Sequence, residues 1–122
     1  ITKTTEKDIV GKWTGIDKGE TGFMIFDEDG YLTMEFDGKK MGGKSFTYKG
    51  KEAKTIYKFH SKKTPYQIDI IISYTNGEVI RKMSCLAEFK DKDTMKFGIA
   101  PASNSRSNKF EDYDSILFTR IK

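Results

Sequence analysis

The chain has 122 residues, the size of a single domain, of which 36% are hydrophobic and 13% aromatic. That aromatic content is too high for a disordered chain and is typical of β-structure. The single cysteine, Cys85, excludes an internal disulfide, and the longest apolar run is far too short to span a membrane.

Positive charge is concentrated in residues 39–63. This segment holds nine lysines and one acidic residue, Glu52, which gives it a net charge of +8 in a chain whose overall net charge is +4. Such a block can attract phosphate, anionic lipid or acidic glycan. A solvated lysine face, which also discourages edge-to-edge pairing of strands, is the simpler interpretation.

Residues 1–8 are predicted to be a tether that ends in a short helical turn. Thr5, with Asp8 three residues later, resembles a capping box. The chain begins with Ile1 rather than Met, which is consistent with removal of a leader. We therefore expect an extracytoplasmic protein, secreted or tethered as a lipoprotein, that contacts a membrane only through a removed N-terminal anchor.

Residues 9–122 are predicted to form one domain of nine short strands. Apolar and polar residues alternate with a period of two in most of them, as in half-buried strands. Residues 27–30 and 76–77 carry hairpin-turn sequences, and residues 38–43 are predicted as a longer turn. The predicted strands cover residues 9–16, 21–27, 31–37, 44–49, 53–60, 66–75, 78–90, 94–100 and 113–121.

The alternation breaks in the strand predicted over residues 78–90. Arg81 shares a face with Val79 and Met83, whereas Ile80 and Leu86 lie on the opposite face. A β-bulge, which inserts one extra residue into a strand, accounts for such a change of parity. We therefore expect a bulge in this strand.

Nearly every connection between the predicted strands is of hairpin length, so neighbouring strands should pair in sequence order. A twisted sheet of this many strands, with no helix to cover it, tends to curl and close, which removes its exposed edges. The sequence therefore predicts an up-and-down antiparallel β-barrel of eight or nine strands. A two-sheet sandwich is the alternative, but its connections need long loops, and only residues 101–112 form one.

Motifs at the two ends of this barrel resemble the lipocalin-like (calycin) superfamily. They are Gly11-Lys12-Trp13 in the first strand and Arg120 in the last. The resemblance implies that Trp13 packs at the closed end of the barrel with Arg120 across it, where a cation over an indole face contributes roughly 0.5–2 kcal/mol. Three further segments are similar to small lipocalin-like domains of bacterial secreted proteins and lipoproteins: Pro65-Tyr66-Gln67-Ile68-Asp69, Asp93-Thr94-Met95 and the loop from Pro101 to Phe110.

A ligand-binding site is expected inside the barrel, at the mouth opposite Trp13. Arg81 and the tyrosines would supply its polar groups, and a buried arginine needs an anionic partner. A barrel filled by its own side chains is the alternative, and residues 101–112, with Arg106, are either a lid or a plain surface loop. The predicted ligand-binding residues are Met34, Phe36, Tyr57, Tyr74, Arg81, Met83 and Phe97, and Phe23 is also expected to face inward.

No group of residues predicts catalysis, a metal site or a cofactor. His60, the sole histidine, has no paired nucleophile, and a metal site needs three or four ligands. Cys85 lies in mid-strand without a nearby histidine, as expected of a buried structural thiol. Residues 27–30 lack the spacing of a calcium loop, and no glycine-rich phosphate loop opens a helix. The chain is therefore predicted not to be an enzyme.

Two non-catalytic functions fit these observations. One is a binding module for a small apolar or amphipathic ligand held in the barrel. The other is a structural or protein-interaction domain of the envelope without a small-molecule site. In the second case the outer contact patch would comprise Val10, Ile16, Ile56 and Ile71.

A third hypothesis is an OB-type nucleic-acid binder. It would use the lysines of residues 39–63, with Tyr48 and Tyr57 as stacking platforms. The hairpin order of the strands and the pairing of Trp13 with Arg120 argue against a nucleic-acid partner. The sequence makes no prediction about oligomeric state.

Overall fold

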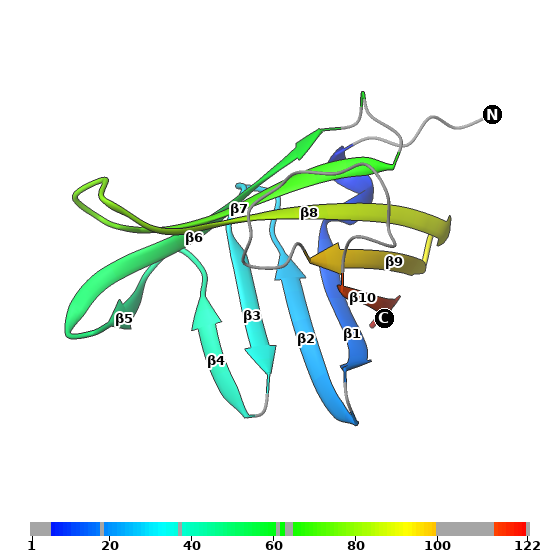
Figure 1. Cartoon of the computed structure of the whole chain (residues 1–122), viewed down its shortest axis with the longest axis horizontal. Helices are drawn as coiled ribbons and strands as arrows, with labels where there is room; N and C mark the ends of the chain where they lie inside the picture. The colour runs from blue at the N-terminus through cyan, green and yellow to red at the C-terminus, as the bar shows by residue number, and fades with distance from the viewer. Residues whose placement is uncertain are drawn as a thin grey trace.

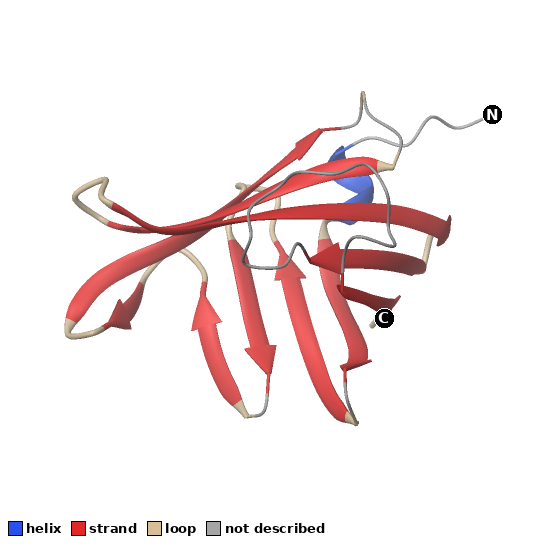
Figure 2. Ribbon diagram, in the orientation of Figure 1, coloured by secondary structure: helices blue, strands red, loops and turns tan. Residues whose placement is uncertain are grey.

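The computed structural model describes residues 6–17, 19–36, 38–60, 62, 65–99 and 114–121. These residues form one antiparallel sheet that curls into a nearly closed barrel, with one short 3-10 helix near the N-terminus (Figure 1; Figure 2). The predicted all-β barrel is therefore confirmed. The predicted tether of residues 1–5 and the predicted lid of residues 101–112, with Arg106, lie outside the described residues. Within the described ranges no helix is long and apolar enough to cross a membrane.

The described part of the chain contributes ten strands to the barrel, rather than the eight or nine expected. The additional strand is β4, in a segment that the sequence predicts as a turn because its lysines and glycine show no apolar alternation. The elements are η1 (Glu6–Ile9), β1 (Gly11–Asp17), β2 (Glu20–Phe26), β3 (Leu32–Phe36), β4 (Lys39–Gly42), β5 (Phe46–Tyr48), β6 (Lys51–His60), β7 (Tyr66–Tyr74), β8 (Val79–Asp91), β9 (Thr94–Ile99) and β10 (Asp114–Arg120).

Strands that are consecutive in the sequence pair with each other, with one exception. The order across the sheet is β4-β3-β2-β1-β10-β9-β8-β7-β6-β5, so the first and last strands pair while β4 and β5 are the two edges. Gly42 and Gly43, with φ values of 109° and 87°, turn the chain away from β3 between these edges. The barrel closes instead where the N–H groups of Thr55 and Tyr57 on β6 donate to the carbonyls of Gly43 and Gly30, both at 3.0 Å.

The inward faces of the strands form one apolar core. The ring of Phe97 packs against that of Phe26, with centroids 6.3 Å apart, and against that of Phe118, at 5.9 Å. These rings come from β9, β2 and β10, so aromatic side chains from separate strands meet in the core. The buried cluster comprises Ile9, Trp13, Met24, Phe26, Leu32, Ile68, Ile70, Cys85, Ala87, Met95, Phe97, Ile116 and Phe118.

The bulge predicted in the strand over residues 78–90 is present. Ile72 of β7 pairs with Arg81 of β8, but the next residue, Ser73, pairs with Val79, so Ile80 is the extra residue. The bulge moves Val79 to the outer face, where 58% of it is exposed. The prediction that Val79 shares a face with Arg81 is therefore wrong.

Three tight hairpins show how turn chemistry positions the strands. In the β2–β3 turn Asp27 is hydrogen-bonded to Tyr31, and in the β7–β8 turn Tyr74 is hydrogen-bonded to Glu78, so each pair encloses three residues. The last of the three is Gly30 or Gly77, with φ values of 94° and 98°. The second loop thus includes Thr75 as well as the predicted pair of residues 76–77. The β5–β6 turn has two residues, Lys49 and Gly50, both with positive φ, as a type I′ turn requires.

Candidate functional site

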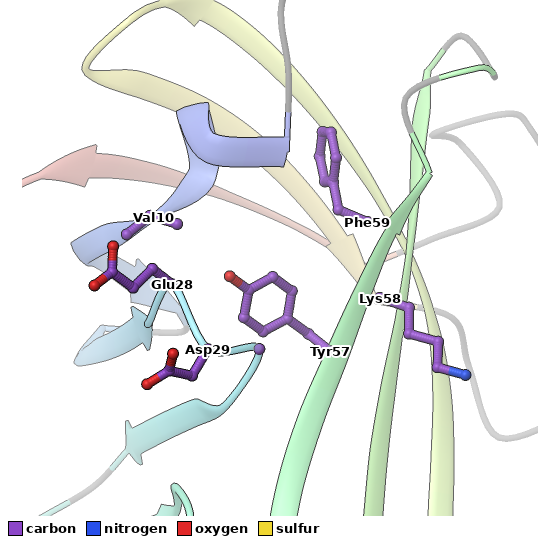
Figure 3. Close-up of a pocket in the computed structure, with 7 residues that line it drawn as sticks. Val10, Glu28, Asp29, Tyr57, Lys58 and Phe59 are labelled. Carbon is purple, nitrogen blue, oxygen red and sulfur yellow. The ribbon is translucent and has the colours of Figure 1, made fainter.

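A pocket with a volume of about 720 Å³ opens between β6, the β2–β3 turn and the start of β1. In Figure 3 the ring of Tyr57 points from β6 toward the β2–β3 turn, and the ring of Phe59 points toward the segment that contains η1. The side chain of Lys58 extends to the opposite side of β6. The lining residues are Val10, Glu28, Asp29, Gly30, Tyr57, Lys58 and Phe59.

The β2–β3 turn that forms one wall of the pocket is fixed by hydrogen bonds. The Asp27 carboxylate accepts bonds from the backbone N–H groups of Asp29, at 3.0 Å, and Tyr31, at 2.8 Å. The hydroxyl of Tyr57 donates to the carbonyl of Asp27 at 2.6 Å, which ties the turn to β6 across the gap. These hydrogen bonds hold the wall in one position, which lowers the entropic cost of binding.

The aromatic wall of the pocket continues into the core. The ring of Tyr57 meets that of Phe26 edge-on, with centroids 4.9 Å apart and an interplanar angle of 89°. The ring of Phe59 lies 5.3 Å from that of Tyr66 on β7. Because these neighbours hold both rings, their remaining surface forms a preformed apolar wall.

Charge is distributed unevenly around the pocket. Glu28 and Asp29 are both exposed, so their carboxylates lie at the rim. Lys58 is also exposed, and its ammonium group points away from the two aromatic rings (Figure 3). The pocket therefore combines an apolar interior with an acidic rim.

The structure does not bring the seven predicted ligand-binding residues together. Tyr57 lines the pocket, but Phe97 is fully buried in the core, and Met34 and Met83 pack against that core. Tyr74 lies beside Tyr48, with ring centroids 6.4 Å apart, far along the sheet on the β5–β6 side. The side chain of Phe36 lies outside the described part of the structure.

One residue that was predicted to be buried inside the barrel is exposed, and another lies on the outer face. Arg81 pairs with the inward-facing Ile72 but is itself exposed, because β8 at this point extends past the filled part of the barrel. It is therefore not the buried arginine that the parity of β8 predicts. Phe23 pairs with Thr14 on the outer face of the sheet, where the Lys12 ammonium lies 5.0 Å from its ring centroid.

Trp13 and Arg120 meet where β1 pairs with β10. The guanidinium carbon of Arg120 lies 4.3 Å from the centroid of the fully buried indole ring, whose N–H donates to the Ile9 carbonyl at 2.9 Å. Arg120 also donates to the carbonyls of Val10, at 2.7 Å, and Asp8, at 2.6 Å. Val10 lines the pocket, so the pocket lies beside the Trp13 end of the barrel and not at the opposite mouth as expected.

The sole histidine and the sole cysteine lie on different strands, β6 and β8. His60 is exposed on β6, with its Nε2 atom 3.0 Å from Asp69 Oδ2 on β7. Cys85 forms no disulfide and is buried in the core. Among the residues that the structure describes, no three His, Cys, Asp or Glu side chains could hold a metal ion.

Comparisons of this chain with protein-family models, with curated proteins and with solved structures find no match. The lipocalin-like resemblance therefore stays a prediction from the sequence. Six pocket residues are not among the ligand-binding residues predicted from the sequence: Val10, Glu28, Asp29, Gly30, Lys58 and Phe59. Phe59 follows Tyr57 at the two-residue spacing that puts both on one face, which was a usable signal. The position of the β2–β3 turn against β6 depends on barrel closure, which has no local sequence signal.

Proposed function

We propose that the chain is a non-enzymatic, lipocalin-like binding module that holds a small amphipathic ligand beside Tyr57. The observation that supports this proposal is the aromatic-walled pocket of about 720 Å³. Small-molecule sites in proteins typically measure roughly 300–1,000 Å³ and combine an apolar lining with a few polar groups. The core of the barrel is filled with side chains, so the ligand lies in this pocket rather than along the barrel axis.

The lining indicates the class of ligand. An apolar chain or ring would pack against Val10, Phe59 and the ring of Tyr57. The Tyr57 hydroxyl already donates to Asp27, so the tyrosine serves as a wall rather than as an anchor. The exposed carboxylates of Glu28 and Asp29 favour a cationic head group over an anionic one. The preferred ligand is therefore a cationic amphiphile rather than a fatty acid.

The test is calorimetric titration of the full chain with dodecylammonium and with dodecanoate, both below their micellar concentrations. We expect the cation to bind more tightly. Phe59→Ala should weaken both ligands about tenfold or more, because it removes an apolar wall. Lys54→Ala is the matched control on the same strand, since Lys54 lies outside the pocket on the outer face of β6, and should leave both affinities unchanged.

A second variant tests the effect of the acidic rim while the aromatic wall stays unchanged. Glu28→Gln combined with Asp29→Asn changes only exposed side chains, so the fold should be retained. We expect this variant to bind both amphiphiles with similar affinity. If the unmodified chain binds neither ligand, or if Phe59→Ala stays folded and binds as well as the parent, the proposal is wrong.

Protein interaction is a second candidate function, supported by the outer face of β1 and β10. Ile16 is 69% exposed and Leu117 56% exposed. They are the chain neighbours of Gly15 and Phe118, which pair on adjacent strands. Of the expected contact patch only Ile16 is exposed, because Val10 lines the pocket and Ile56 and Ile71 are half-buried. A dimer in light scattering that Ile16→Glu converts to monomer would support this function.

A further inference from the structure

The ends of two hairpins project beyond the rest of the barrel. In Figure 1, β5–β6 and β7–β8 extend to the left past β3 and β4. We call residues 48–54 and 74–82 the wing tip. The N–H of Thr75 donates to the carbonyl of Glu52 at 3.2 Å, and the rings of Tyr48 and Tyr74 have centroids 6.4 Å apart. These contacts make the two hairpin ends one continuous surface.

The wing tip is cationic. It holds five basic and two acidic side chains, a net charge of +3 in 16 residues. One of the acids, Glu52, accepts a hydrogen bond from the Ser45 hydroxyl at 2.7 Å. Four of the basic side chains are exposed: Lys49, Lys51, Arg81 and Lys82. The local charge is therefore available to an anionic partner.

The wing tip also carries apolar and amphipathic groups. Val79 is 58% exposed, one of the largest values for an apolar side chain in the described part of the chain. The ammonium of Lys49 lies 5.5 Å from the ring centroid of Tyr48, and that of Lys51 lies 5.4 Å from that of Tyr74. Tyrosines with an apolar body and a polar tip, next to cations, are typical of protein segments at a membrane interface.

We infer that the wing tip docks the protein onto an anionic lipid surface. Each lysine or arginine near such a surface strengthens binding roughly fivefold, so five basic groups outweigh two acids. Val79 would enter the region of the acyl chains while the lysines stay among the head groups. The inference goes beyond the proposed function and does not depend on the pocket.

The arrangement of the charges favours a lipid surface over a nucleic acid. Lys51 and Arg81 lie on the inner face of the sheet, whereas Lys54 and Lys82 lie on the outer face, as their pairing partners show. Binders of single strands instead line one groove with cations and offer free aromatic faces to bases. Here the lysines occupy positions over the tyrosine rings, and the cations surround a projecting edge.

The test is co-sedimentation of the full chain with vesicles of phosphatidylcholine alone and with vesicles that contain 30% phosphatidylglycerol. We expect binding to the anionic vesicles only, with loss at high salt. Lys49→Asn combined with Lys51→Gln should weaken binding between about fivefold and thirtyfold. Asn suits the left-handed conformation at position 49, where φ is 49°, so the fold should be retained. Val79→Ser should weaken binding further.

The matched control removes the same charge elsewhere. Lys39→Gln combined with Lys40→Gln acts on exposed lysines of β4, outside the wing tip, and should change binding less than threefold. The inference is wrong if both vesicle types bind equally, if neither binds, or if the two double variants are equally weakened. It is also wrong if a single-stranded oligonucleotide binds the same lysines more tightly than the vesicles at equal salt. Phe59→Ala should leave vesicle binding unchanged, which separates this test from that of the pocket.

Discussion

The barrel closes at two seams, and they are built in different ways. At the first seam, β1 and β10 pair through residues such as Thr14 and Thr119, and Arg120 lies over the buried Trp13. At the second seam, β6 meets the β2–β3 turn and the β4–β5 link through the N–H groups of Thr55 and Tyr57 and a single bridge between Tyr31 and Ile56. The first seam is a regular ladder and the second a set of separate contacts.

The first seam contributes mainly to the stability of the barrel, whereas the second seam lies beside the pocket. The Arg120 side chain donates to three backbone carbonyls at the first seam, including those of Asp8 and Lys92, so this seam fixes both chain ends of the barrel. The second seam borders the pocket, and the buried hydroxyl of Thr55 there has no hydrogen-bond partner among the described residues. We expect substitutions at the first seam to cost the most stability and those at the second to cost little or even to stabilise.

Trp13→Ala should give the largest effect. The indole is fully buried, so its removal leaves a cavity and should lower the free energy of unfolding by about 3–5 kcal/mol. Urea denaturation followed by circular dichroism measures the change. Ile16→Ala, on the same strand but 69% exposed, is the control and should change stability by less than about 0.5 kcal/mol. Equal losses in the two variants would contradict the role of Trp13.

Arg120→Lys should give the second largest effect. Lysine keeps the charge but lacks the planar fork that reaches the carbonyls of Val10, Asp8 and Lys92. We expect a loss of about 1.5–3 kcal/mol in the same denaturation assay. Arg81→Lys, at an exposed site in the wing tip, is the matched control and should be neutral. A neutral Arg120→Lys would show that the charge alone is sufficient.

The contrast between the seams also explains which parts of the fold and of the pocket can be predicted from the sequence. The alternation in β7, the turn signals of residues 27–30 and 76–77, and the bulge in β8 are local patterns, and each is confirmed. β4 was missed because an edge strand that faces solvent needs no apolar residues. The pocket was missed because its walls come from residues far apart in sequence, brought together only when the second seam closes. The prediction that Arg81 is a buried site residue is wrong, because the alternation of residues along a strand indicates which face of the sheet a side chain is on. It does not indicate whether that part of the strand lies within the filled part of the barrel.

Thr55→Val probes the second seam and should stabilise the protein. The substitution replaces a fully buried hydroxyl without a partner among the described residues by a methyl group of similar shape. We expect a gain of about 1 kcal/mol, since the cost of burying an unpaired polar group is removed. Thr119→Val, at an exposed position on the first seam, is the control and should be neutral. A loss of stability in Thr55→Val would indicate that a water or ligand pairs with this hydroxyl.

Glu88→Gln should give the smallest effect and sets the baseline for a charge pair outside both seams. A hydrogen bond from Lys90, at 2.8 Å, lowers the pKa of the Glu88 carboxyl, against a smaller opposing effect of burial. A carboxyl whose pKa is lowered by folding stabilises the protein above its unfolded pKa and loses that contribution as the pH falls through the folded pKa.

Both partners are about half exposed, so the contribution of the Glu88–Lys90 pair is less than about 0.5 kcal/mol. Unfolding measured from pH 7 down to pH 3 should therefore show a slightly flatter profile in Glu88→Gln than in the parent. Lys90→Gln should flatten it less, because the charge of Lys96 still lowers the pKa of Glu88. A steeper profile in either variant would mean that the pair is not formed in solution.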